Sequence, residues 1–95
     1  MIRIEIVYSG RVQGVGFRYT TTSIARRFDV AGYVQNLPDG KVRLIAEGVR
    51  GQVLRLLDAV RNQMAGNITH ELVNDAQATG EFGAPAQADT FVIRY

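Results

Sequence analysis

The sequence contains no cysteine and no tryptophan, and His70 is its single histidine. Without cysteine there is no disulfide bond, no thiol nucleophile and no cysteine ligand for zinc or an iron–sulfur cluster. One histidine also excludes a metal site built from several histidines. The first residues alternate in polarity and lack the apolar segment of a signal peptide. We therefore expect a reduced protein of the cytoplasm.

Long hydrophobic runs and blocks of one charge are also missing. No apolar run approaches the roughly 20 residues of a membrane-spanning helix. The net charge is only +2, and the ten arginines and one lysine are scattered along the chain. This distribution gives little support for membrane or non-specific nucleic-acid binding, but it permits a local anion site. The 95 residues suffice for one hydrophobic core, so residues 1–95 are interpreted as a single domain.

The spacing of apolar residues predicts a series of strands and helices. Ile2, Ile4, Ile6 and Tyr8 alternate, which places them on one face of a strand. Apolar residues recur at helical spacing from Val53 to Met64. The full series is a strand over residues 2–8, a helix over about 18–28, strands over 32–36 and 41–47, a helix over about 53–64, a strand over about 68–79, a loop of small residues over 80–89 and a strand over 90–95.

This order of elements predicts an α+β protein of the ferredoxin-like class. The pattern is βαββαβ, a sandwich in which an antiparallel sheet carries two helices on one face, with an extra C-terminal strand. Pro38-Asp39-Gly40 predicts the turn between the second and third strands. The same fold serves enzymes, RNA-binding modules and sensors, so it does not define a function by itself.

A glycine-rich loop, residues 10–16, separates the first strand from the first helix. Gly14 and Gly16 permit positive φ angles, which let consecutive N–H groups turn toward a bound anion. The following helix N-terminus also favours negative charge, and Arg18 adds a guanidinium that can bind two phosphate oxygens. We therefore predict a phosphate-sized anion site. The alternative is that the glycines only form a tight turn, and we expect Phe17 to be a core residue.

Asn36 ends the predicted second strand, which can neighbour the first strand and its loop. A carboxamide both donates and accepts hydrogen bonds, so it can orient a water molecule without deprotonating it. The alternative interpretation is that Asn36 only caps the hairpin turn.

The other titratable residues do not indicate a second functional site. No two carboxylates lie at a spacing that indicates a metal site or an acid–base pair. We expect Asp39 and Asp89 in solvated turns and His70 at the surface or on an edge strand. Arg26 and Arg27 are expected on a solvated helix face.

The sequence Gly-Arg-Val-Gln-Gly-Val-Gly-Phe-Arg at 10–18, with Gly-Tyr-Val-Gln-Asn at 32–36 and the Asp39-Gly40 turn, closely resembles the acylphosphatase family. The resemblance is strong over roughly residues 4–48 and is one of pattern beyond. It implies a compact cytosolic enzyme without cofactor or metal that hydrolyses the carboxyl–phosphate anhydride of acyl phosphates. We expect a monomer with a small-molecule substrate and no nucleic-acid or membrane partner.

The resemblance also implies roles for individual residues. Arg18 would bind the substrate phosphate, and Asn36 would orient the attacking water. The phosphate cradle would consist of the backbone amides of Gln13, Gly14, Val15, Gly16 and Phe17. Two positions depart from the family pattern. Gln35 stands where a basic residue often precedes the asparagine, which is expected to weaken the attraction for anions. Residues 64–67 lack the Gly-Pro that often follows the second helix.

Two other functions remain open at this stage. A non-catalytic regulatory domain would keep the cradle and bind phosphate without hydrolysis. An RNA-binding module is suggested by residues 14–17, but that segment lies in a loop, and the four Tyr and four Phe are dispersed. The physiological substrate is also open, with carbamoyl phosphate, acetyl phosphate and 1,3-bisphosphoglycerate as candidates.

Overall fold

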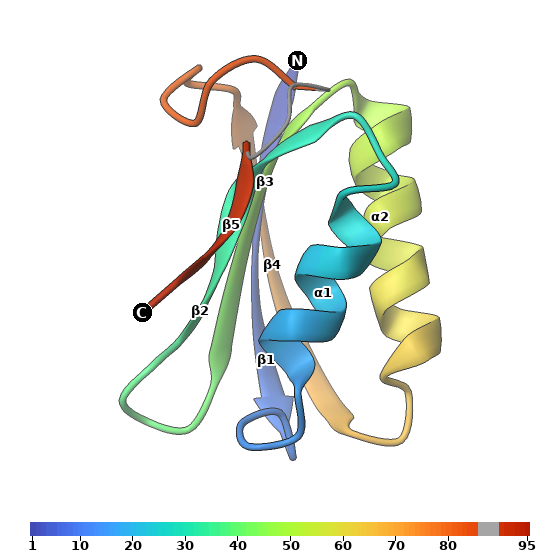
Figure 1. The fold of residues 1–95 in the computed structure, drawn as a ribbon, viewed down its shortest axis with the longest axis vertical. Helices are drawn as coiled ribbons and strands as arrows, with labels where there is room; N and C mark the ends of the chain where they lie inside the picture. The colour runs from blue at the N-terminus through green and yellow to red at the C-terminus, as the bar shows by residue number, and fades with distance from the viewer. Residues whose placement is uncertain (86–89) are drawn as a thin grey trace.

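The computed structural model describes residues 1–85 and 90–95. Two helices and five strands make up this described part (Figure 1). In chain order they are β1 (Ile2–Gly10), α1 (Phe17–Ala25), β2 (Val30–Asn36), β3 (Val42–Gly48), α2 (Arg50–Gln63), β4 (Ile68–Gln77) and β5 (Phe91–Arg94). The predicted order of elements is confirmed. Asp89 and the last part of the expected loop lie outside the described residues.

The strands form one sheet in the order β4-β1-β3-β2-β5, and both helices cover the same face (Figure 1). Antiparallel pairing joins β1 to β3 and β4, and β2 to β3, as expected for the ferredoxin-like fold. The expectation that β2 neighbours β1 is wrong, because β3 lies between them; both strands run in the same direction and end at the same edge of the sheet. The extra strand β5 runs parallel to β2, so the whole sheet is mixed. The chain leaves β4 at the end of the sheet where β2 begins (Figure 1). A strand added from that end therefore runs in the direction of β2.

The hydrophobic core lies between the sheet and the helices. Ile4, Ile6 and Tyr8 of β1 are buried, as their alternation predicts. The predicted apolar face of α2 is also buried and consists of Val53, Leu56, Leu57 and Val60. Full burial of one such side chain contributes roughly 1.5–3 kcal/mol. The core therefore holds β1 and both helices in fixed positions, and the loop between β1 and α1 is held with them.

Phe17 anchors the start of α1 in this core. Its side chain is only 1% exposed, and its ring centroid lies 5.1 Å from that of Tyr8, with an angle of 56° between the planes. Tilted aromatic contacts of this kind are favourable beyond their buried area. The prediction that Phe17 is a core residue is confirmed, and its contact with β1 fixes the position of the residue that follows, Arg18.

α1 is shorter than the sequence pattern suggests. It ends at Ala25, and a tight turn in which the Phe28 N–H donates to the Ala25 carbonyl at 3.0 Å follows it. The threonine-rich stretch has low helix propensity, yet it forms the middle of α1. Thr21 and Thr22 are buried, and the Thr22 hydroxyl donates to the Arg18 carbonyl at 2.8 Å. Packing and this side-chain hydrogen bond therefore override propensity.

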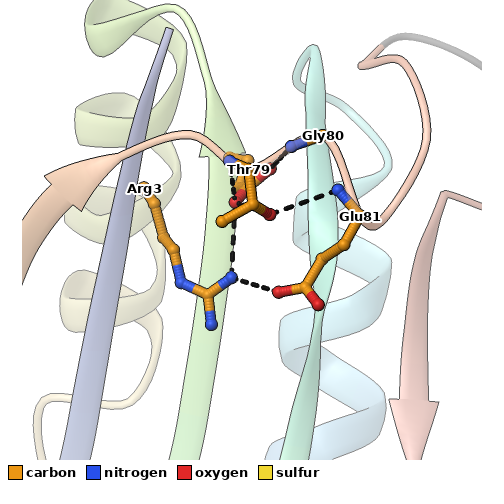
Figure 2. Close-up of polar contacts among 5 residues, drawn as sticks. Arg3, Thr79, Gly80 and Glu81 are labelled. Carbon is orange, nitrogen blue, oxygen red and sulfur yellow. Dashed lines mark hydrogen bonds and ion pairs between the residues drawn. The ribbon is translucent and has the colours of Figure 1, made fainter.

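A buried carboxylate closes the end of the sheet that is remote from the glycine loop. Glu47 accepts hydrogen bonds from the N–H and hydroxyl of Thr79, both at 2.8 Å, and from the N–H of Gly80 at 2.9 Å. Arg3 lies 3.4 Å from the same carboxylate and also pairs with Glu81 (Figure 2). These contacts hold the segment after β4 against β1 and β3.

Candidate active site

The loop between β1 and α1 has the backbone conformation that its glycines predict. Gly14 has a φ of 75° and Gly16 a φ of 77°, both in the left-handed region. A Cβ on either residue would meet no atom within 4 Å, so conformation and not crowding requires glycine here. Gly16 is the N-cap of α1, and no side chain caps this helix end. The first N–H groups of the helix are therefore open to a ligand.

Four hydrogen bonds fix the loop to the rest of the molecule. The Gln13 side-chain amide donates to the carbonyls of Leu37 and Lys41, both at 2.8 Å. The Arg11 N–H donates to the Asn67 carbonyl at 2.9 Å, and the Asn67 amide returns a bond to the Arg11 carbonyl at 3.1 Å. Val12 is buried between these anchors. The loop is thus a braced element and not a free turn.

A cavity of about 220 Å³ lies where this loop, β2 and β5 meet. It brings together the two predicted side chains, Arg18 and Asn36, which are separated by the whole of α1. Its full lining is Val12, Gly14, Gly16, Phe17, Arg18, Tyr19, Asn36, Ile93 and Tyr95. Gln13 and Val15, expected to contribute backbone amides, are not in this lining. The Gln13 side chain faces the β2–β3 hairpin instead, and the Val15 side chain is exposed.

Arg18 lies in the first turn of α1 with its guanidinium at this cavity. The guanidinium carbon is 4.9 Å from the centroid of the Tyr95 ring, a cation–π geometry. None of the ion pairs between described residues involves Arg18. Its N–H donors therefore face the cavity without competition from a described carboxylate, as an anion ligand requires.

Asn36 is the last residue of β2, paired in register with Val42. Its side-chain oxygen Oδ1 is buried and accepts no hydrogen bond from any described group. The turn that follows is closed by other groups: the Leu37 N–H donates to the Lys41 carbonyl at 2.8 Å, and Asp39 accepts from the Lys41 N–H at 3.1 Å. The structure therefore does not support a capping role for Asn36. Asn36 is also a lining residue of the cavity, so its amide, which can both donate and accept, lies beside the space that a ligand or water would occupy.

Gln35 replaces the basic residue that often precedes the asparagine in the family, but the two strands beside it each carry an arginine next to Gln35. Gln35 pairs in register with Arg43 on β3 and with Arg94 on β5. Arg43 forms an ion pair with Glu5 at 3.0 Å, and Arg94 lies over the ring of Tyr33 at 3.8 Å. Both guanidiniums belong to the face of the sheet without helices, so they contribute charge near Asn36 but are not part of the cavity lining.

The other residues weighed in the sequence lie where they were expected. Asp39 is exposed in the hairpin turn, and His70 is exposed on the edge strand β4. Arg26 and Arg27 are exposed as expected, but they follow α1, which ends at Ala25, and so do not form a helix face. Within residues 1–85 and 90–95, no three His, Cys, Asp or Glu side chains are grouped as a metal site would need. Neither of the described helices is long and apolar enough to cross a membrane.

Sequence reasoning missed two contributions to this site. The side chain of Gln13 braces the loop, and β5 with its following residue supplies Ile93 and Tyr95 to the cavity. Tyr95 was a possible site residue from the sequence, because it is an aromatic residue directly after a short apolar strand. Its position at the cavity, however, depends on the parallel pairing of β5 with β2.

Fold and site together define a small α+β domain with a cavity formed by a glycine loop, an arginine and an asparagine at the β1–α1 junction. The family model for acylphosphatase matches residues 4–93. The chain therefore belongs to the acylphosphatase family, and it is a hydrolase acting on acyl phosphates. The similarity covers the second half of the chain as well as the two motifs.

Individual relatives agree with this assignment. An acylphosphatase of Acaryochloris marina is 39% identical over 84 residues, which is 88% of this chain and 90% of the relative. An acylphosphatase of Mycolicibacterium vanbaalenii is 37% identical over 87 residues, covering 92% and 87% of the two chains. The crystal structure of acylphosphatase from Bacillus subtilis aligns with a TM-score of 0.83 and 32% identity over 100% of both chains.

Proposed function

We propose that acyl phosphates are hydrolysed in the cavity between the glycine loop, β2 and β5. Arg18 and the backbone amides of the loop residues in the lining, Gly14, Gly16 and Phe17, hold the phosphoryl group, and Asn36 orients the attacking water. One observation carries this proposal. Arg18 and Asn36 line the same cavity of about 220 Å³, although the whole of α1 separates them in the sequence.

The chemistry requires little from the protein beyond binding and orientation. The water oxygen forms a bond to phosphorus while the bond from phosphorus to the acyl oxygen breaks, and the leaving group is a stable carboxylate. The charge on the phosphoryl oxygens is stabilised in the transition state by fixed N–H donors and by Arg18. Asn36 accepts a hydrogen bond from the water through Oδ1 and holds it in line. The proton of the water passes to a phosphoryl oxygen or to the departing carboxylate, since none of the lining residues in the described part of the chain has a carboxylate or imidazole side chain.

The proposal includes a reaction without metal or cofactor, in the cytoplasm, by a monomer without a nucleic-acid partner. The support for a metal-free reaction is the lining itself, which consists of amides, a guanidinium, aromatic rings and aliphatic side chains. Turnover in the presence of EDTA tests the first part. Sedimentation of the purified protein and fractionation of cells test the monomeric state and the location.

The decisive experiment measures hydrolysis of benzoyl phosphate by the purified protein with EDTA present. We expect Arg18→Ala and Asn36→Ala each to reduce kcat/KM by about 10²–10³-fold, the usual effect of removing one transition-state donor or positioning group. Arg27→Ala and Asn62→Ala replace exposed residues of the same types and are expected to retain activity. Circular dichroism confirms that all variants fold.

The outcomes separate this function from its alternative. Loss of turnover in both site variants, with activity kept in both controls, supports the proposed roles. A folded wild-type protein that binds phosphate in calorimetry but hydrolyses no acyl phosphate contradicts the proposal and indicates a regulatory phosphate-binding domain.

A further inference from the structure

A second and larger cavity continues from the proposed phosphoryl site. Its volume is about 470 Å³, and it lies between α1 and β5. It shares Tyr19, Ile93 and Tyr95 with the smaller cavity, and its other lining residues are Thr22, Ser23, Arg26 and Val92. A molecule held at Arg18 by its phosphoryl group therefore has a path past the shared residues into this groove, which we call the acyl groove.

The near part of the acyl groove is aromatic and aliphatic. Tyr19 is 76% exposed and Tyr95 is 91% exposed, although tyrosines usually bury most of their ring. Neither ring is needed for the core. Ile93 lies between them on the groove wall and adds an aliphatic surface. Exposed aromatic rings beside a cavity provide a surface on which a flat apolar group can bind.

The far part of the groove is cationic. Tyr19, Thr22 and Ser23 of α1 and its C-cap residue Arg26 recur at intervals of three and four residues, so they lie on one side of the helix. Arg26 follows Arg18 by eight residues, which corresponds to about 12 Å along the helix axis. No described carboxylate forms an ion pair with Arg26. Its long side chain can lie along the groove and present the guanidinium to an anionic group.

On the basis of the proposed function, we propose that the acyl groove binds the acyl part of the substrate. The lining selects acyl phosphates whose acyl group has a flat apolar body and ends in a second anionic group. Tyr19, Ile93 and Tyr95 contact the body, and Arg26 binds the terminal anion. The substrate is thus held by one guanidinium at each end, and the reacting bond lies at the Arg18 end.

The test compares two synthetic substrates that differ only in terminal charge. These are 4-carboxybenzoyl phosphate and its neutral analogue 4-carbamoylbenzoyl phosphate. The measured quantity is the ratio of their kcat/KM values in the wild type and in Arg26→Gln. Intrinsic differences in reactivity cancel when this ratio is compared between variants. We expect Arg26→Gln to lower the ratio about fivefold, as loss of one half-exposed charge-assisted contact implies.

Two controls isolate the groove from general electrostatics. Arg27→Gln removes the neighbouring positive charge, which does not line the groove, and is expected to leave the ratio unchanged. Ser23→Phe places a ring inside the groove and is expected to raise the KM for benzoyl phosphate about tenfold, while Ser23→Ala does not. All four variants should hydrolyse acetyl phosphate like the wild type, because the acetyl group is too short to enter the groove.

The results distinguish this inference from the proposed function. Suppose that all variants hydrolyse acetyl phosphate normally, and that the ratio of kcat/KM values is the same in the wild type, Arg26→Gln and Arg27→Gln. This result overturns the proposed role of the acyl groove but leaves the proposed catalytic site supported. An equal fall of the ratio in Arg26→Gln and Arg27→Gln also overturns it, since a non-specific field would then explain the preference. Failure of the wild type to hydrolyse both acetyl phosphate and benzoyl phosphate refutes the proposed function itself.

Discussion

The side-chain amide of Gln13 donates to the backbone carbonyl of Leu37 at 2.8 Å. This bond joins the glycine loop, which leads to Arg18, to the residue directly after Asn36. A second bond of the same amide reaches the Lys41 carbonyl across the hairpin, also at 2.8 Å. One side chain therefore sets the distance between the two halves of the proposed active site.

Replacing Gln13 by methionine keeps the size of the side chain and removes both donors. We expect the free energy of unfolding to fall by about 1–2 kcal/mol, since each hydrogen bond contributes roughly 0.5–1.5 kcal/mol. We expect kcat/KM for benzoyl phosphate to fall about tenfold, because small displacements of binding groups reduce the rate strongly. Steady-state kinetics and hydrogen exchange of the loop amides measure these effects.

Gln63→Met serves as the matched control, because Gln63 is exposed at the end of α2. This variant should keep the activity of the wild type, and its loop amides should exchange as slowly as those of the wild type. Similar activity in Gln13→Met and the wild type would show that the loop keeps its position without the brace.

Gly16 is expected to resist substitution for a conformational reason. With φ at 77° and open space at the Cβ position, Gly16→Ala introduces backbone strain without a clash. The left-handed conformation costs an L-residue about 1–2 kcal/mol, so the free energy of unfolding should fall by that amount. Gly16→Asn should lower the free energy of unfolding less than Gly16→Ala does, since asparagine tolerates the left-handed conformation better. Urea denaturation measures both.

Gly51 provides the opposite case. It lies in α2, its φ is not positive, and a Cβ would meet no atom within 4 Å. Gly51→Ala should therefore raise the free energy of unfolding by about 0.5–1 kcal/mol through helix propensity. If both alanine variants changed stability in the same direction, backbone conformation would not be the deciding factor.

Tyr8 carries a buried hydroxyl to which no described group is hydrogen-bonded. Burial raises the pKa of this phenol, and the negative charge of Glu71 raises it further. An unpaired buried hydroxyl costs about 1–3 kcal/mol. Tyr8→Phe keeps the ring contact with Phe17 and should raise the free energy of unfolding by about 1 kcal/mol. In an alkaline absorbance titration of the wild type, we expect Tyr8 to ionise only on unfolding, and Tyr8→Phe should remove that contribution. A loss of stability in Tyr8→Phe would mean that the hydroxyl has a partner.

The sequence predicted those parts of the site that depend on local chemistry. The positive φ angles of Gly14 and Gly16 and the place of Arg18 after them follow from the loop motif itself. The meeting of Arg18 and Asn36 follows from the βαββαβ order, because that topology brings the end of β2 to the β1–α1 loop. The family resemblance then suggested the chemical roles of both residues.

Other parts depend on contacts between distant segments, which no local pattern records. The sequence predicted a role only for the backbone amide of Gln13, but its side chain reaches the hairpin more than twenty residues away. Tyr95 enters the cavity only because β5 runs parallel to β2. Glu47 lies on a strand whose alternation places it on the face without helices. Its burial depends on the segment after β4 folding over that face.

The Glu47 carboxylate is expected to make the free energy of unfolding depend on pH in the acidic range. Burial alone would raise the pKa of this carboxyl, but the donors of Thr79 and Gly80 and the Arg3 guanidinium together lower it below its ordinary value. A carboxyl with a lowered pKa in the folded state stabilises the protein above its unfolded pKa of about 4.3. This contribution is lost as the pH falls through the folded pKa. Stability should therefore be constant near neutrality and decrease steeply in acid.

Glu47→Gln tests the assignment of this acid sensitivity to one residue. At pH 7 we expect the variant to lose about 2–4 kcal/mol, because it removes the charge that four donors stabilise in a site only 2% exposed. The difference from the wild type should shrink as the pH falls from the unfolded pKa of about 4.3 through the lower folded pKa, because Glu47 then becomes protonated in the wild type too. Glu81→Gln is the matched control, because Glu81 pairs with the same Arg3 at the surface and should cost less than about 1 kcal/mol. The cluster lies at the end of the sheet remote from the cavity, so both folded variants should keep kcat/KM within about twofold. A constant difference between wild type and Glu47→Gln from pH 7 to pH 3 would show that another group controls the acid transition.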